Sequence, residues 1–214
     1  MRLVTSIFDW FIMDITVVVT NYNYGRYLGR CIRSLISQDL DQKSYEIIVV
    51  DDGSTDDSLE HLQVYSADVR IIALNENFGL SHAANTGMRA AKSRYVVRVD
   101  SDDFVHRSFL STLLLGFELH GKDYEAISCD YIKVTPSGEA MAYGEAESQP
   151  IACGIAFKAD ILEVLGYYNK NLRINEEIDL RTRFSAEGFR IKNIALPLYR
   201  YVKHDDSLTR KVLI

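Results

Sequence analysis

The first half of the chain alternates short apolar runs with segments whose apolar residues recur at helical spacing. This alternation predicts strands separated by helices. The runs contain few polar residues, which is typical of parallel strands covered by helices on both faces. We therefore expect an α/β fold with a mostly parallel central sheet. The expected strands are 15–20, 46–50, 69–74 and 95–99, and the expected helices are 26–37, 55–65 and 81–91.

The second half of the chain is less regular. Its pattern predicts helices at 107–119, 157–165 and 176–184, and strands at 126–131, 139–143, 191–195 and 198–201. The 214 residues include only three prolines and no low-complexity tract, linker or internal repeat. This length fits one domain with a sizeable core, which we place at residues 14–210.

Residues 1–13 stand outside this pattern as an N-terminal extension. Most of them are apolar, and only Arg2 and Asp9 are charged. The segment is too short to span a membrane and has no small-residue cleavage site. Either it has no role in the fold, or it forms a short amphipathic helix that docks on a membrane or a partner.

Charge and cysteine content narrow the class of protein. The net charge of −6 argues against a nucleic-acid binder, because such proteins need a basic face for phosphates. Cys31, Cys129 and Cys153 have no paired spacing, which is typical of buried thiols in a reducing compartment. We expect a cytoplasmic protein that contacts the inner face of a membrane at most peripherally. The oligomeric state stays open.

Polar side chains follow all four predicted parallel strands at their carboxyl ends. Ligands of open parallel sheets bind at this edge, so four polar strand ends together are more specific than any one of them. The segments are Thr20-Asn21-Tyr22, Asp51-Asp52, Asn75 to Asn77, and Asp100-Ser101-Asp102-Asp103.

The last of these segments places three carboxylates within four residues. Carboxylates this close repel one another unless a cation neutralises them, and Mg²⁺ or Mn²⁺ prefers carboxylate oxygen. Because Mg²⁺ is usually shared with substrate phosphates, the segment points to a phosphate-bearing ligand held through a metal. The alternative is an acidic turn that caps the following helix.

Other segments have both a structural and a functional interpretation. Asp51 and Asp52 precede a Gly-Ser turn, where an acceptor could take the N–H of a uracil or the hydroxyls of a ribose. Asn77 belongs to a turn rich in Asn and Gly. Asn85 and Gly87 lie inside a predicted helix, where both are unfavourable, so we expect a polar contact or a close approach there.

Two further groups are candidates for chemistry. A predicted helix begins with three acidic residues, Glu176, Glu177 and Asp179. This is more negative charge than a helix N-terminus requires, so one of them is a candidate general base. His204 follows the last predicted strand and stands among charged and hydroxyl residues. It is either a surface residue or a group that holds a metal or touches a diphosphate.

Taken together, these segments resemble the inverting glycosyltransferases of family 2. The resemblance extends from about residue 15 to 210 and rests on the order and spacing of its motifs. They are Thr20-Asn21-Tyr22-Asn23, Ser34-Leu35-Ile36-Ser37-Gln38, Glu46 to Asp56, Asn77-Phe78-Gly79-Leu80, Asn85-Thr86-Gly87, Asp100-Ser101-Asp102-Asp103 and Gly166-Tyr167-Tyr168-Asn169. The family implies the GT-A fold, a Rossmann-like arrangement in a single domain.

The resemblance also implies roles. The donor would be a nucleotide-diphospho-sugar, most commonly a UDP-sugar, and the acceptor a glycan or lipid-linked hydroxyl in surface polysaccharide assembly. Thr20 and Asp52 would contact the base, and Asp100 the ribose or the metal. Asp102 would hold Mg²⁺ or Mn²⁺ at the diphosphate, and Glu177 would be the base. The remaining candidates for nucleotide-sugar contact are Asn21, Tyr22, Asp51, Asn77, Asn85 and Ser101.

Two departures from the family pattern bear on activity. The usual Glu-Asp pair is Glu176-Glu177 here, and a carboxylate displaced by about 1 Å can cost on the order of 10²-fold in rate. Ala84 stands where many members have arginine. These departures motivate an alternative, a catalytically weak or inactive nucleotide-sugar-binding module. A nucleotidyltransferase is a further alternative, although the loop after the first strand has a single glycine.

Overall fold

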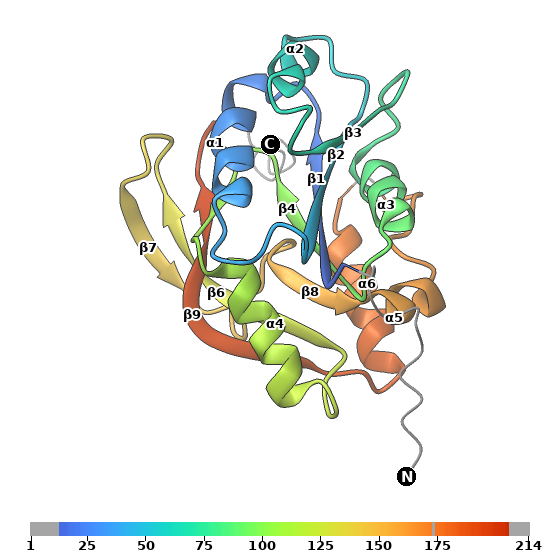
Figure 1. Ribbon diagram of the computed structural model, residues 1–214. Helices are drawn as coiled ribbons and strands as arrows, with labels where there is room; N and C mark the ends of the chain where they lie inside the picture. Colours follow the sequence, from blue (N-terminus) through green and yellow to red (C-terminus); the bar gives the residue numbers. More distant parts are fainter. Residues whose placement is uncertain (1–12, 173, 206–214) are drawn as a thin grey trace.

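The computed structural model describes residues 13–172 and 174–205, so almost all of the N-terminal extension and residues 206–210 lie outside the described residues. From β1 to β4, strands and helices alternate as the pattern predicts (Figure 1). The strands are β1 Ile15–Asn21, β2 Tyr45–Asp51, β3 Arg70–Ala73, β4 Tyr95–Asp100, β5 Phe104–Val105, β6 Ala126–Val134, β7 Ala140–Gly144, β8 Ile155–Lys158 and β9 Ile191–Val202. The helices are α1 Gly25–Ile36, α2 Ser58–Gln63, α3 Leu80–Ala90, α4 Phe109–His120, α5 Ala159–Leu165 and α6 Glu176–Ala186.

One sheet holds these strands in the order β3-β2-β1-β4-β8-β6-β9-β5, with β7 paired to β6. The strands β3, β2, β1 and β4 are mutually parallel, as predicted. The register places Thr20 beside Asp100 and Asn21 beside Asp51. The polar strand ends predicted from the sequence therefore lie at one edge of the sheet.

Helices cover both faces of the sheet (Figure 1). Along β1, alternate residues serve opposite faces: Val17 and Val19 pack in the cluster formed with α1 and α4, and Val18 packs with α3, α5 and α6. Gly87 lies where α3 crosses this sheet, and an added Cβ there would come within 2.4 Å of Val18 Cγ1. The close approach predicted for this glycine is confirmed.

The second half differs from the prediction in two places. Residues 155–158 form strand β8 ahead of α5, where we expected a helix from residue 157; pairing with both β4 and β6 outweighs local preference in so short a segment. The two expected final strands are one strand, β9, whose pairing with β6 shifts register near Pro197. Proline is tolerated at such an irregularity because its missing N–H is not needed there.

The three cysteines are buried free thiols, as predicted. Within residues 13–172 and 174–205, the helices are too short or too polar to cross a membrane.

Candidate functional site

The end of β1 and the turn after β2 are joined by buried polar contacts. Asn21 Nδ2 donates to Asp51 Oδ1 at 2.8 Å, and the Ser54 backbone N–H and hydroxyl donate to the same carboxylate. Asn21 and Asp51 therefore hold the turn together. The Oδ1 atom of Asn21 is buried and has no partner among the described residues.

The neighbouring carboxylate, Asp52, connects this turn to the loop that enters α3. Its two oxygens accept the backbone N–H groups of Phe78 at 2.9 Å and Gly79 at 2.8 Å. Beside it, Tyr22 and Asn77 are exposed and Thr20 is buried. Asp52 thus fixes the loop whose exposed asparagine was predicted to contact a ligand.

Asp102 and His204 come together although 102 residues separate them. Asp102 Oδ2 lies 2.8 Å from His204 Nε2. The His204 side chain is 3% exposed and packs against Tyr27, with ring centroids 4.7 Å apart. The contact between Asp102 and His204 has the length of a hydrogen bond. Two neighbouring ligands of an octahedral ion with bonds of about 2.1 Å also lie about 3 Å apart, so the spacing is compatible with a divalent cation.

Asp103 has a structural role in the same turn. It is buried and accepts the Val202 backbone N–H at 2.7 Å and the Tyr199 hydroxyl at 2.8 Å, which fastens β9 to the turn. Burial raises the pKa of this carboxyl well above its usual range.

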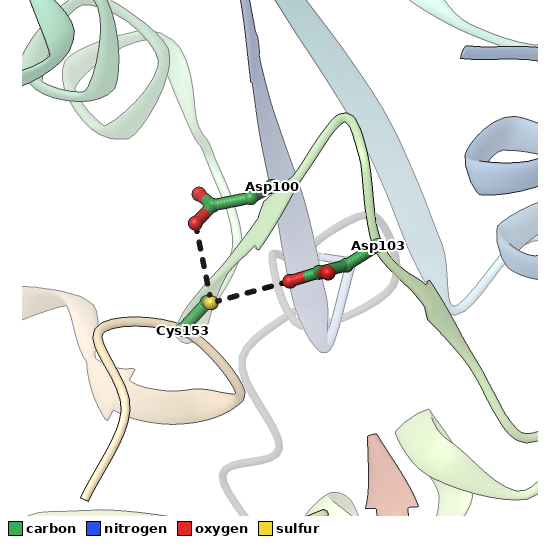
Figure 2. A group of neighbouring side chains, drawn as sticks. All are labelled: Asp100, Asp103 and Cys153. Atoms are coloured by element: carbon green, nitrogen blue, oxygen red, sulfur yellow. Dashed lines mark hydrogen bonds between the residues drawn. The ribbon is translucent and has the colours of Figure 1, made fainter. Parts of the chain in front are cut away.

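Cys153 lies between Asp100 and Asp103, and the three ligand atoms are within 4.8 Å of one another (Figure 2). Its thiol is 3.3 Å from Asp100 Oδ2 and 3.8 Å from Asp103 Oδ2. Burial raises the pKa of Cys153 well above its ordinary value, so the sulfur keeps its proton. The distances are those of hydrogen bonds, so we interpret this cluster as hydrogen-bonded and develop the pair of Asp102 and His204 as the candidate cation site.

Arg98 is a buried member of the site that the sequence analysis missed. Its Nε donates to Asp100 Oδ1 and its Nη1 to Glu176 Oε1, each at 3.0 Å, and the residue is 3% exposed. The signal in the sequence was a lone charge inside an otherwise apolar buried strand. Arg98 brings the acidic start of α6 to the end of β4.

The three acids of α6 differ in their partners. Glu176 is buried against Arg98, and Asp179 accepts from Arg183 Nη2 at 2.6 Å. Glu177 is half-buried; its carboxylate accepts its own backbone N–H, and no side chain of the described residues forms a hydrogen bond or an ion pair with it. Burial is the main cause that raises the pKa of Glu177 above its ordinary value, and the charges of Arg98 and Arg181 act in the opposite direction. Of the three acids, Glu177 is the one that no described side chain pairs with.

Asn85 makes the polar contact predicted for it, but with the backbone. Its amide donates to the Tyr168 carbonyl at 2.8 Å and accepts the Tyr168 N–H at 2.9 Å. Both polar groups of this side chain are thereby used inside the protein.

The unpartnered polar atoms gather in this region. Among the described residues, three buried side-chain polar atoms have no hydrogen-bond partner: Asn21 Oδ1, Ser101 Oγ and His204 Nδ1. All three belong to residues that the sequence analysis selected as ligand contacts. Buried polar groups are rarely left unsatisfied, so we interpret these three atoms as candidates for a partner that the described residues do not supply.

A parallel sheet whose carboxyl edge carries such a site, followed by antiparallel strands and the helix of acids, is the GT-A fold of glycosyltransferases. The chain belongs to glycosyl transferase family 2, whose sequence model matches residues 16–194. The predicted fold and enzyme class are confirmed.

Relatives and solved structures agree with this assignment. The chain is 35% identical to the uncharacterized glycosyltransferase EpsJ of Bacillus subtilis, over 91% of this chain and 62% of EpsJ. It is 46% identical to glycosyltransferase GlyA of Streptococcus pneumoniae, over 46% of this chain and 14% of GlyA. Staphylococcus aureus TarS 1-349 in complex with UDP-GlcNAc superposes with a TM-score of 0.80 at 20% identity, covering 91% of this chain and 60% of TarS 1-349.

A second solved structure is the mannosyltransferase PcManGT of Pyrobaculum calidifontis in complex with GDP-Man and Mn²⁺. It has a TM-score of 0.71 at 21% identity and covers 95% of this chain and 60% of that one. At such identities the likeness establishes the fold. The chain spans between 14% and 63% of the length of four curated relatives, the glycosyltransferases GlyA, GlyG, YibD and EpsJ.

Proposed function

We propose that this chain transfers a sugar, with inversion, from a nucleotide-diphosphate donor to a hydroxyl of a glycan or lipid-linked acceptor. The observation that carries the proposal is the group of three unpartnered buried atoms at the carboxyl edge, on Asn21, Ser101 and His204. A donor bound there would supply the missing hydrogen bonds. TarS was solved with UDP and with UDP-GlcNAc, which favours a UDP-sugar as donor.

Asp102 and His204 would hold a divalent cation, Mn²⁺ or Mg²⁺, at the diphosphate. PcManGT was solved with Mn²⁺, which supports metal use in this fold. When bound, such a cation stabilises the charge that develops on the departing nucleoside diphosphate. Around it, Thr20, Tyr22, Asp52 and Asn77 would contact the nucleotide.

Glu177 would act as the general base. It takes the proton of the acceptor hydroxyl while that oxygen bonds to the anomeric carbon, and the bond from that carbon to the diphosphate oxygen breaks. The nucleoside diphosphate leaves with the bonding electrons, and one displacement inverts the anomeric centre. Its raised pKa makes Glu177 a better proton acceptor than an ordinary carboxylate, and no side chain of the described residues forms an ion pair with it.

The acceptor class follows from relatives rather than from a motif. One relative is the poly(ribitol-phosphate) beta-N-acetylglucosaminyltransferase TarP of Staphylococcus aureus, and another is the chondroitin synthase of Escherichia coli. Both names refer to enzymes that make or modify a polymer, which supports a role in polysaccharide assembly. The buried free thiols support a reducing, cytoplasmic setting, with peripheral membrane contact as the remaining expectation.

Calorimetric titration of UDP, GDP and CDP, with and without Mn²⁺, tests the donor site. We expect UDP to bind wild type in the presence of Mn²⁺ and to lose most of its affinity in Asp102→Ala. Asp68→Ala, which removes a carboxylate after α2, is the matched control and retains wild-type binding. Failure of all three nucleotides to bind would overturn the proposal.

The binding module without turnover is the second candidate, because Glu177 stands where the family usually has aspartate. It predicts UDP-sugar binding with no release of UDP, either to water or to any acceptor. Release of UDP that depends on Glu177 would eliminate it.

A further inference from the structure

A cavity of about 190 Å³ lies between β6, the start of β9, the segment before β8, and α6. Its lining includes Ser128, Cys153, Arg181 and Asn193, with Glu147 among the exposed residues at its rim. Liquid water occupies about 30 Å³ per molecule, so the cavity has the volume of roughly six waters. That is space for a group the size of one sugar ring.

The cavity adjoins both halves of the proposed reaction centre. On one side, the Cys153 thiol lies 3.3 Å from Asp100 Oδ2 (Figure 2). Next to it, the Gly154 N–H donates to the Arg98 carbonyl at 3.0 Å. On the other side, Arg181 follows Glu177 by four residues on α6, so both project from one face of the helix. A molecule bound by Arg181 would therefore lie on the side of α6 that carries the proposed base, one helical turn from Glu177.

The polar groups of the lining are unequal. Ser128 donates to Asn193 at 2.9 Å and Asn193 donates to Asp130, so these groups already have partners. Arg181 is half-buried and forms no hydrogen bond or ion pair within 4.0 Å with the described residues, although its charge acts on Glu177 and lowers the pKa of that carboxyl. Even Glu147 at the rim forms no ion pair with it within 4.0 Å.

A half-buried guanidinium whose donors form no hydrogen bond with the described residues favours an oxyanion. Its planar donors match a carboxylate or phosphate in bidentate geometry, and such charge-assisted hydrogen bonds are roughly twice as strong as neutral ones. Glu147 disfavours an anion at the exposed rim, so the acidic group belongs at the Arg181 side of the cavity.

We propose that this cavity is an acceptor subsite and that Arg181 binds a carboxylate or phosphate of the acceptor, placing a neighbouring hydroxyl at Glu177. The inference rests on the proposed function, because it assumes that Glu177 on α6 is the general base. It adds a substrate class: acceptors that carry an acidic group next to the hydroxyl that is glycosylated.

The test is a titration monitored by NMR at the Arg181 Nε–H resonance, assigned by its loss in Arg181→Lys. The probes are methyl β-glucuronide, methyl β-glucoside 6-phosphate and the neutral methyl β-glucoside. We expect saturable shifts with an acidic probe and at least about tenfold weaker binding of the neutral one. A response to the glucuronide alone identifies a carboxylate-bearing acceptor, and a response to the 6-phosphate alone identifies a phosphate-bearing acceptor.

Equal binding of the neutral glucoside would overturn the acidic class, and absence of any shift would overturn the subsite. Arg181→Gln should weaken the acidic probe about tenfold or more, whereas Lys122→Gln, which removes a positive charge outside the cavity, should not. UDP titration of the same samples separates the two proposals: retained UDP binding without probe binding refutes the subsite and leaves the donor site standing.

Discussion

Arg98 and Glu176 form an ion pair inside the protein: Nη1 lies 3.0 Å from Oε1, and the two side chains are 2% and 4% exposed. The pair joins β4, which ends in the aspartate-rich turn, to the first residue of α6. Arg98 Nε also donates to Asp100 Oδ1. One guanidinium therefore sets the position of the proposed donor turn relative to the helix that carries the proposed base.

Removal of Arg98 should lower the free energy of unfolding substantially. Arg98→Met leaves Glu176 buried without its partner, and breaking such a pair costs about 3–5 kcal/mol in the free energy of unfolding. Urea denaturation measures it, with Arg94→Met as control because the Arg94–Asp14 pair is exposed and should contribute about 1 kcal/mol or less. In Arg98→Met/Glu176→Met we expect part of the loss to be recovered; a fully additive loss would contradict the assignment.

Glu177→Gln should abolish base catalysis while leaving the donor site intact. We expect sugar transfer to fall by about 10²–10⁴-fold and the Kd for UDP to stay at the wild-type value. In wild type, kcat/KM should rise with pH through the raised pKa of Glu177, because the base acts only when deprotonated. Asp179→Asn is the control: it loses the contact with Arg183 but keeps the pH profile.

The same substitution should change stability in a pH-dependent way. The folded pKa of Glu177 lies above its ordinary 4.5, so ionised Glu177 disfavours folding once the pH exceeds the raised value. Glu177→Gln should therefore be more stable than wild type near pH 7. Below pH 4.5 the glutamate is protonated in both states, and the difference should vanish. Thermal unfolding across this pH range checks the sign; a less stable Gln variant at pH 7 would contradict it.

Asn85→Ala should lower stability without touching nucleotide affinity. It leaves the Tyr168 N–H and carbonyl unpaired, which costs about 1–3 kcal/mol in unfolding free energy. Paired measurements of denaturation and UDP binding decide the role. Lost UDP binding in a folded variant would restore Asn85 as a nucleotide contact.

Two mid-helix glycines should respond in opposite directions to alanine. In Gly87→Ala the new Cβ meets Val18 and Val50 side chains of the sheet, and overpacking of this kind costs about 1–3 kcal/mol. In Gly29→Ala it meets only the flexible ends of Arg33 and Tyr65, so the gain in helix propensity of up to about 1 kcal/mol should dominate. Equal shifts in the denaturation midpoint would show that packing at Gly87 is not tight.

The parallel half of the fold was predictable because parallel strands joined by helices have a fixed arrangement. Polar residues at the carboxyl ends of parallel strands must meet at one edge, so Asn21, Asp52 and Ser101 could be placed together from the sequence alone. The unusual helix residues Asn85 and Gly87 likewise predicted contacts that exist.

The second half depends on contacts between distant segments. Glu176 and Glu177 are adjacent, and successive helix residues point about 100° apart, so only the docking of α6 decides which one faces Arg98. Strand β8 forms because β4 and β6 flank it, and neither partner is visible in the local pattern. Cys153 was missed for the same reason, whereas Arg98 had a local signal, its lone charge in an apolar strand, but nothing in that strand indicated its partner Glu176.

The position of β9 near the end of the described residues also determines when the site can form during synthesis. Asp102 leaves the ribosome 102 residues ahead of His204, a delay of roughly 5–20 seconds at ordinary rates of synthesis. During that interval the turn lacks both His204 and the Val202 N–H that holds Asp103. A donor that needs both ends of this pair would therefore engage only after β9 has been added, and its binding energy would favour the finished domain over its precursors.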